Sequence, residues 1–378
     1  MIYFDNAATT VCSSAAADKI LYMLKENFGN PSSLHKMGLD ATMAISSAAS
    51  CVASLIGADA SEIIFTSGAT ESNNLCILGA LDARKRSFNS IVYSAVEHES
   101  VLSVCKKAES LGYEAIKIAP LSTTEADIEA IANSVNEKTA LVSLMLVNNE
   151  TGAISKVREC VSLVKRKNPG TLVHCDLTAA LGKIPINVRD LGIDLASMSA
   201  HKLHGPKGVG AAYIKKGVRI SPILVGSSQQ GAIRPGTEST ALIMGFSEAA
   251  REAKERLQES FSEISKISVF LKQRLKEIDG TVIHTPENAS PYIINFSNCR
   301  VRSEIMLHFL EMKEIYVSSG SACKKGEPSH VLLSAKKSRK EADTALRISL
   351  CRYNTIEEAK EFVDALMEGL DKIIPSYR

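Results

Sequence analysis

Short runs rich in β-branched residues alternate with longer segments of helical apolar spacing through the first part of this 378-residue chain. Such alternation is typical of strands that lie side by side in a mostly parallel sheet covered by helices. Seven runs fit one sheet: residues 62–65, 90–93, 115–118, 141–146, 172–176, 194–198 and 210–214. The sequence therefore predicts an α/β fold.

The pattern changes near Ser239. A long helical stretch rich in charged residues runs from there to Ile278. The shorter elements that we expect after it are strands at 292–296, 315–317 and 347–350, a helix at 304–312 and a closing helix from residue 356. These elements predict a second, smaller α+β domain, with the long helix as its hinge.

Composition narrows the function classes. The chain is 45% hydrophobic with a net charge of +2 and no basic stripe, which argues against nucleic acid as a direct partner. Its nine cysteines contain no C-x-x-C pair, so neither a disulfide framework nor a zinc site is predicted. No basic and apolar leader and no unbroken run of 18 apolar residues is present. We therefore expect a cytoplasmic protein with reduced thiols and no membrane segment.

Ligands of open α/β sheets bind beyond the carboxyl ends of the strands, so residues at strand ends are the first candidates for a site. The small residues of segment 66–71 follow one predicted strand and precede a helix. They are typical of a phosphate site at a helix N-terminus, and equally of a capping box that uses Thr70 with Asn73 or Ser67 with Glu71.

Two further strand ends carry Asp176 and Lys202. Taken alone, the aspartate could ligate a metal, cap a helix or pair with a protonated ring nitrogen, and the lysine could be a solvated loop residue. Together they are the two groups that pyridoxal phosphate requires, an acid for the ring nitrogen and an amine that binds the aldehyde as a Schiff base. Thr70, Ser199 and His201 are available for the phosphate.

The remaining strand ends add His98 and Asn148. A histidine at this position could lie flat on a cofactor ring or shuttle protons, or it could simply cap the next helix. Asn148 and Asn149 could be turn residues before Gly152.

Several motifs occur in the order found in the cysteine desulfurases, pyridoxal-phosphate enzymes that take sulfur from L-cysteine. They are residues 3–10, 28–33, 66–72, 97–98, 147–150, 174–176, 201–202 and 318–323. The chain is similar to this family from Tyr3 to about Thr355. The resemblance implies the fold-type I architecture of pyridoxal-phosphate transferases, with a large cofactor-binding domain at 13–258, a small domain made of 1–12 and 259–378, and a homodimer with shared active sites.

The resemblance also implies a role for each candidate residue. Lys202 resembles the Schiff-base lysine, Asp176 the partner of the ring nitrogen, and His98 the acid/base that stacks on the ring. The other implied cofactor ligands are Ala69, Thr70, Ser199 and His201 at the phosphate, with Thr237 contributed across the dimer, and the implied substrate ligands are Asn148 and Arg347. An arginine suits a carboxylate because its planar fork donates two parallel hydrogen bonds.

Cys323 is the residue that indicates sulfur chemistry. It ends the run Ser-Ser-Gly-Ser-Ala and precedes Lys324 and Lys325, two cations that favour the thiolate. The resemblance implies that this thiolate attacks the sulfur of L-cysteine, becomes a persulfide and leaves L-alanine. The implied acceptors are an iron–sulfur scaffold protein or a tRNA-thiolation enzyme.

The chain departs from the family pattern at four places. Ala179 stands where a glutamine usually contacts the cofactor ring oxygen, the loop 226–230 lacks its usual glycines, and Cys351 replaces a common glycine. The interval between Cys323 and segment 327–330 is also short. These departures leave two alternatives, a related lyase or aminotransferase and a divergent homologue that mainly binds or carries sulfur.

Overall fold

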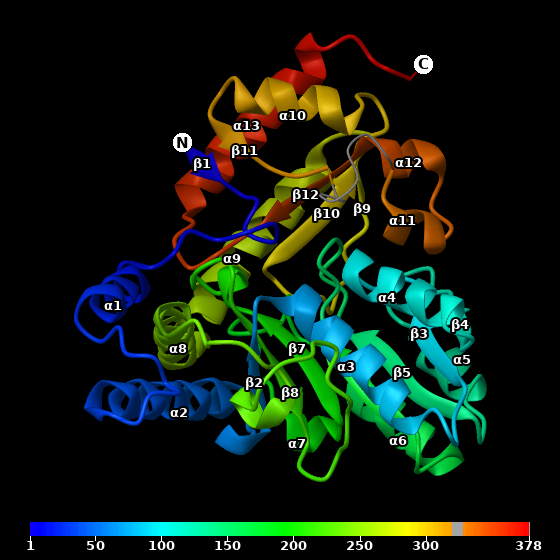
Figure 1. Ribbon diagram of the computed structural model, residues 1–378. Helices are drawn as coiled ribbons and strands as arrows, with labels where there is room; N and C mark the ends of the chain where they lie inside the picture. Colours follow the sequence, from blue (N-terminus) through cyan, green and yellow to red (C-terminus); the bar gives the residue numbers. More distant parts are fainter. Residues whose placement is uncertain (320–327, 378) are drawn as a thin grey trace.

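The computed structural model describes residues 1–319 and 328–377, and its largest element is a seven-stranded sheet (Figure 1). The strand order is β2-β8-β7-β6-β5-β3-β4, and β8 alone in this sheet runs antiparallel to both of its neighbours. The strands are β2 (Ile63–Thr66), β3 (Ser90–Ser94), β4 (Glu114–Ile118), β5 (Thr139–Met145), β6 (Leu172–Asp176), β7 (Leu195–Ser199) and β8 (Gly210–Ile214). The predicted α/β class and all seven predicted strands are confirmed.

Alternate side chains of each strand enter two different hydrophobic cores. Ile91 packs in the core beneath α3 (Ala69–Arg84) and α4 (Glu99–Ser110), whereas its neighbour Val92 belongs to the core on the other face. Successive side chains of a strand point to opposite faces, so apolar residues at successive positions require helices on both faces. The second face is covered by α2 (Lys36–Ile56), α6 (Val157–Lys167) and α8 (Thr240–Glu255), while the short helices α5 (Ile128–Asn133) and α7 (Val188–Leu191) pack against α6.

The chain ends meet in a smaller group of elements above the large sheet, where both termini lie in Figure 1. Strand β1 (Ile2–Tyr3) pairs in parallel with β11 (Ile315–Tyr316), and β10 (Ile293–Ser297) lies between β12 (Ala345–Ser349) and β9 (Val282–Ile283). The helices here are α10 (Ser303–Glu311), α11 (His330–Ser334), α12 (Arg339–Thr344) and α13 (Ile356–Lys372). The domain boundary at 258 and 259 stays a prediction.

Phe4 and Phe362 connect the N-terminal segment to the closing helix. Both rings are fully buried, with their centroids 5.9 Å apart and in edge-to-face contact. A capping box of Thr355 and Glu358 begins α13 at its expected place. The N-terminal segment therefore packs against the C-terminal part of the chain. This packing positions Ala7 and Ala8, which line the candidate site.

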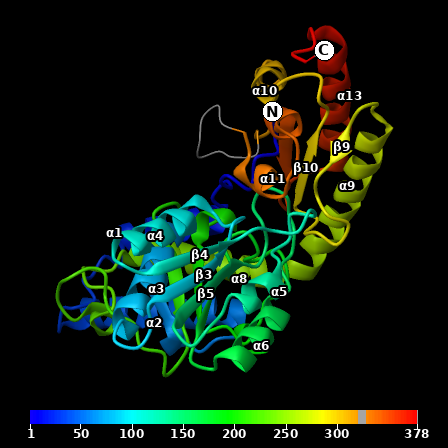
Figure 2. The same ribbon diagram turned by 90° about the vertical axis from the view of Figure 1, so that its right-hand side faces the viewer.

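The charged stretch after Ser239 is two helices rather than one. Helix α8 ends at Glu255. The backbone of the next residue, Arg256, leaves the helical region with φ −99° and ψ 4°, and α9 (Leu257–Glu277) then begins. The expectation of a single long hinge helix is therefore wrong. The break lets α8 pack on α1 (Ser14–Lys25) and α2 while α9 runs beside α13 (Figure 2).

Within the described residues, α2 is the one helix long and apolar enough to cross a membrane by length and composition alone. A core helix passes the same test, and α2 buries Val52, Ala53 and Ile56 in the main core.

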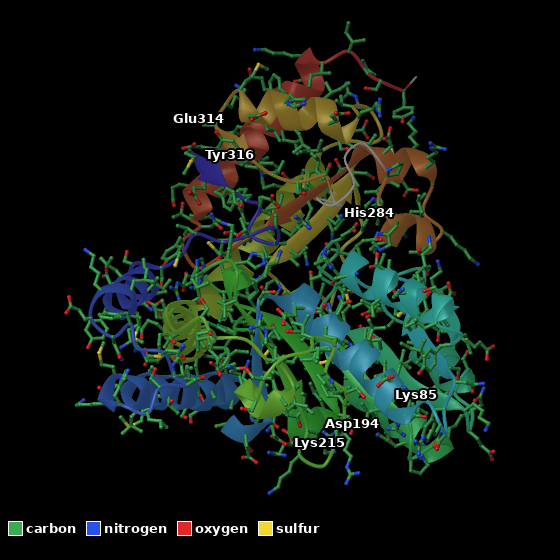
Figure 3. All side chains as sticks on the ribbon, viewed as in Figure 1. Lys85, Asp194, Lys215, His284, Glu314 and Tyr316 are labelled. Atoms are coloured by element: carbon green, nitrogen blue, oxygen red, sulfur yellow. The ribbon has the colours of Figure 1, made fainter. Side chains whose placement is uncertain are left out.

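The amino ends of the parallel strands lie at one edge of the large sheet. There Asp194 lies near Lys215 (Figure 3) and accepts a hydrogen bond from Val173 N. The opposite, carboxyl edge carries the candidate site.

Candidate active site

A cavity of about 640 Å³ lies at the carboxyl ends of the strands in the large sheet. Residues of the large sheet region and residues of the smaller group of elements above it both line the cavity. Its predicted members are Ala69, Thr70, His98, Asp176, Ser199, His201, Lys202 and Arg347, and further members include Thr9, Glu150, Ala179, Lys183, Lys207 and His330. The structure thus brings eight candidates into one space, as expected for residues at neighbouring strand ends.

One end of the cavity is formed by the N-terminus of α3. Gly68 is the N-cap residue with φ 156°, a conformation that L side chains rarely adopt, and Ala69 and Thr70 form the first turn. A Cβ on Gly210 would lie 2.7 Å from the Cα of Gly68, so the two glycines allow close backbone approach. The Glu71 carboxylate also accepts a hydrogen bond from Ser67 N at 2.7 Å. The contact is not a capping box, because Gly68 is the N-cap and no side chain caps α3. The first turn of α3 lines the cavity, as a phosphate site at a helix N-terminus requires.

Asp176 ends β6 as a nearly buried carboxylate, with 4% of its surface exposed. One oxygen accepts a hydrogen bond from Asn73 Nδ2 at 3.1 Å, and the other accepts one from Thr178 N at 2.9 Å. No group of three potential metal ligands occurs within 1–319 and 328–377. The two donors fix the orientation of the carboxylate.

His98 is both the cap of a helix and a wall of the cavity. Its Nδ1 accepts a hydrogen bond from Ser100 N at 3.2 Å at the start of α4. Burial lowers the pKa of His98, although Asp176 acts in the opposite direction. The imidazole is therefore neutral at neutral pH and fixed in orientation, and the expectation of a helix cap is confirmed.

Lys202 follows β7 in a single 3-10 turn and points toward the N-terminal segment. Its Nζ donates hydrogen bonds to the carbonyl oxygens of Ala7 and Ala8, the latter at 2.6 Å. The neighbouring His201 contacts Thr9 Oγ1 at 3.1 Å, and burial together with the Lys202 charge lowers the pKa of His201 to about 4. His201 is therefore a neutral donor or acceptor at neutral pH.

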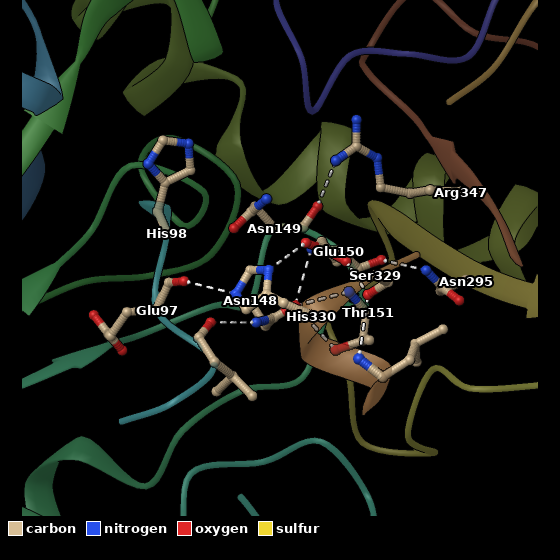
Figure 4. Close-up of polar contacts among 12 residues, drawn as sticks. Glu97, His98, Asn148, Asn149, Glu150, Thr151, Asn295, Ser329, His330 and Arg347 are labelled. Carbon is tan, nitrogen blue, oxygen red and sulfur yellow. Dashed lines mark hydrogen bonds and ion pairs between the residues drawn. The ribbon is translucent and has the colours of Figure 1, made fainter. Parts of the chain in front are cut away.

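Arg347 lies in the centre of β12 with 1% of its surface exposed. Its Nη2 lies 2.7 Å from Asp5 Oδ1, and its Nη1 donates to the carbonyl oxygen of Asn149 at 3.0 Å (Figure 4). The guanidinium is thus fixed by one contact from the N-terminal segment and one from the turn after β5. This arrangement is what a pre-oriented carboxylate binder needs.

Asn148 lies in a tight turn rather than in the cavity wall. Its Nδ2 donates to the carbonyl oxygen of Val96, and its Oδ1 accepts from the backbone nitrogens of Glu150 and Thr151, each at 2.9 Å. These contacts agree with the prediction that Asn148 is a turn residue. Asn149 and Glu150, rather than Asn148, line the cavity. A direct contact of Asn148 with the substrate carboxylate stays a prediction.

Sequence reasoning missed a buried contact between the large sheet and α11. The Glu150 carboxylate accepts a short hydrogen bond from Ser329 Oγ, and His330 Nδ1 lies 3.6 Å from its other oxygen (Figure 4). His330 Nε2 lies 3.2 Å from the carbonyl oxygen of Glu97. Local sequence pattern gives no signal for this contact, because Glu150 lies 179 residues away from Ser329.

Besides Asn148, one predicted residue in the described part of the chain does not line this cavity: Thr237, which is exposed. Cys323 lies outside the described residues. Ala179 lies in the cavity wall, where its methyl group offers no hydrogen bond. Lys183, four residues further on, also lines the cavity and was not predicted.

The residues present fit pyridoxal phosphate. The cavity combines an amine at Lys202, an oriented carboxylate at Asp176 and a helix N-terminus with close-packed glycines. In addition, Thr178 Oγ1 and Asn73 Oδ1 are buried without a hydrogen-bond partner in the described chain. An aldehyde, a ring nitrogen and a phosphate are the groups that this donor set matches.

The aminotransferase class-V family model matches residues 2–362, so the chain belongs to this family, whose members in general depend on pyridoxal phosphate. It is 37% identical over 376 residues to a cysteine desulfurase IscS of Dictyoglomus turgidum, covering 98% of this chain and 95% of that one. A solved NifS-like protein matches at 36% identity with a TM-score of 0.93, covering 98% of this chain and all of the other. A structure described as SspA in complex with cysteine matches at 29% identity with a TM-score of 0.83, covering 94% and 100%. The predicted resemblance to cysteine desulfurases is confirmed.

Proposed function

We propose that this protein is a pyridoxal-phosphate-dependent cysteine desulfurase, which converts L-cysteine to L-alanine and receives the sulfur on Cys323. The observation that carries the proposal is the convergence of Lys202, Asp176, His98 and Arg347 on one cavity. Full-length relatives that carry this activity in their names support it. A related lyase or aminotransferase is not favoured, because the full-length relatives are named cysteine desulfurases although the family model carries the broader name aminotransferase.

Each cavity residue has a task toward the cofactor. Lys202 would bind the aldehyde, Asp176 would hold the ring nitrogen protonated, and the first turn of α3 with Ser199 and His201 would bind the phosphate. When bound, pyridoxal phosphate supplies an electron sink for the α-carbon of an amino acid. Because Ala179 lacks a polar group, it offers no hydrogen bond to the cofactor, which would cost about 1 kcal/mol of cofactor binding.

Proton transfer and substrate orientation are assigned to three side chains. The Lys202 amine is the base for the α-proton, since it lies in the cavity beside the cofactor residues. His98 is neutral at neutral pH and therefore accepts the proton of the substrate thiol. Arg347 binds the substrate carboxylate and thereby places the sulfur atom for attack by the Cys323 thiolate.

The sulfur-transfer step balances without an external oxidant. The Cys323 thiolate forms an S–S bond with the substrate sulfur as the substrate C–S bond breaks, and the carbon skeleton retains the electron pair and takes up a proton to become L-alanine. Release of sulfide from the persulfide then requires a thiol reductant or an acceptor protein.

We also propose a homodimer, because the first helices expose a large amount of apolar surface. Between residues 21 and 43 the exposed large apolar side chains are Leu21, Tyr22, Leu24, Phe28, Leu34, Met37, Leu39 and Met43. So many exposed apolar side chains in one segment indicate a protein interface. The exposed Thr237 would then reach the phosphate site of the partner subunit.

We further propose that the protein works in the cytoplasm. Its sulfur acceptor would be an iron–sulfur scaffold protein or a tRNA-thiolation enzyme.

One assay tests the activity. Purified holoenzyme with L-cysteine and a thiol reductant should release sulfide and alanine in equal amounts. Cys323→Ala should abolish sulfide while retaining the yellow cofactor band, and Cys51→Ala, a half-buried cysteine between α2 and α8, should behave as wild type. Wild-type protein that binds the cofactor but makes no alanine would refute the proposal.

A further inference from the structure

Asn73 is a fully buried residue of α3 that contacts both the end of β6 and the start of α4. Its Nδ2 donates one hydrogen bond to Asp176 Oδ2 at 3.1 Å and a second to Ser100 Oγ at 2.9 Å. An amide nitrogen carries two protons. Both protons of Asn73 Nδ2 therefore go to residues that line the active-site cavity.

Ser100 extends this series of contacts to His98. Its Oγ lies 2.8 Å from His98 Nδ1, and its backbone nitrogen donates to the same ring nitrogen at 3.2 Å. A continuous series of hydrogen bonds thus runs from the carboxylate of Asp176 through Asn73 and Ser100 to the imidazole of His98. We refer to the side chains of Asn73 and Ser100 as the bridge.

The neighbours of Asn73 allow only one orientation of its amide. The reversed orientation would place Oδ1 against a carboxylate oxygen of Asp176, and two acceptors repel each other. In the orientation adopted, Oδ1 is buried and has no hydrogen-bond partner within the described residues. An unpaired buried carbonyl oxygen lowers the stability of the fold. The amide is thus better suited to holding its two acceptors than to stabilising α3.

The bridge removes rotational freedom from two side chains at once. Without it, Asp176 would keep the hydrogen bond from Thr178 N, and His98 would keep the one from Ser100 N. A carboxylate or an imidazole held by one backbone donor can still turn about its last bond. Because Asn73 and Asp176 are 103 residues apart in the sequence, the bridge also fixes α3 and α4 relative to β6.

We propose that Asn73 is a positioning residue that, together with Ser100, fixes Asp176 and His98 in one mutual arrangement before pyridoxal phosphate binds. This inference rests on the proposed function, which assigns these two side chains to the cofactor and the substrate. Asn73 does not line the cavity, so it acts only through its neighbours. Groups that are already ordered lose less entropy on binding, and the bridge thereby raises the affinity for the cofactor.

Cofactor affinity tests the bridge without relying on activity. The yellow band that forms when pyridoxal phosphate is titrated into the apoprotein gives the dissociation constant. Asn73→Leu keeps the size of the side chain but removes both donors, and it should raise the dissociation constant about tenfold. Ser100→Ala keeps the backbone contact to His98 and should raise the dissociation constant about threefold.

A double variant and a matched control separate the bridge from a general loss of stability. Independent effects of Asn73→Leu and Ser100→Ala would multiply to about thirtyfold, whereas two parts of one bridge should together give about tenfold. Asn298 is the matched control, because it is a buried asparagine with two donated hydrogen bonds and an unpaired Oδ1 in the smaller group of elements. Asn298→Leu should lower the thermal midpoint as Asn73→Leu does, but should leave the cofactor affinity unchanged.

The possible results distinguish this inference from the proposed function. Unchanged affinity in Asn73→Leu, an equal loss in Asn298→Leu, or a thirtyfold loss in the double variant overturns the bridge. If Asn73→Leu does not fold, unchanged affinity in Ser100→Ala overturns it instead. Wild-type protein that binds the cofactor but forms no alanine refutes the desulfurase activity alone, because the affinities still test the bridge. Wild-type protein that binds no cofactor refutes both.

Discussion

The Arg347 side chain offers a direct test of substrate recognition. Arg347→Met keeps a long apolar stem in the centre of β12 but removes both the charge and the planar fork. A hydrogen bond to a charged group contributes about 1.5–3 kcal/mol. Two parallel bonds to the substrate carboxylate therefore contribute about 3–6 kcal/mol, which predicts a loss of about 150-fold to 20,000-fold in kcat/KM for L-cysteine.

The structure separates this loss from a folding defect. The substitution leaves Asp5 without its ion-pair partner, but the Asp5 side chain is 21% exposed and water can solvate it. The fold should therefore survive, with a thermal midpoint close to that of wild type. Asp5→Asn is the matched variant, because it removes the partner of Arg347 but keeps the guanidinium, and it should cost much less activity.

Cysteamine, which is L-cysteine without its carboxylate, completes the test. Alanine formation from L-cysteine and sulfide formation from both compounds are measured for wild type and Arg347→Met. The substitution should reduce the rate with L-cysteine but hardly change the slow rate with cysteamine. An equal loss on both compounds would show that Arg347 does not bind the carboxylate and would refute the reasoning.

Three further outcomes are expected. Lys202→Ala should lose the yellow cofactor band on gel filtration and reduce alanine formation to background, and a stable cofactor band would contradict its assigned task. Phe362→Ala should lower the free energy of unfolding by about 3–5 kcal/mol, measured by urea titration, because it removes a buried ring that packs against Phe4. His284, in the upper part of Figure 3, has a pKa lowered by burial to about 4, so the unfolded chain binds more protons than the native protein between pH 6.5 and 4, and stability falls as pH falls through this window. His284→Gln should remove about 2 kcal/mol of that acid-dependent loss. If the urea midpoint of the variant depends on pH between these values in the same way as that of wild type, the prediction is contradicted.

Strand positions were predictable because they depend on local pattern. All seven strands of the large sheet were found within two residues, since β-branched runs and the turns that bound them are properties of neighbouring residues. The sequence analysis does not predict the antiparallel direction of β8, although the connection from β7 is too short for a parallel crossover and indicates that direction. The break at Arg256 was missed because both helices have the same charged composition.

The candidate site also has features that depend on local sequence and features that depend on the tertiary structure. The chain itself determined which strand ends carry His98, Asp176 and Lys202, because the alternation of strands and helices brings the ends of parallel strands to one edge. Only the tertiary structure decided that Asn148 turns inward to the backbone while Lys183 lines the active-site cavity. Side-chain direction and burial depend on contacts between residues far apart in the sequence, and no local pattern encodes them.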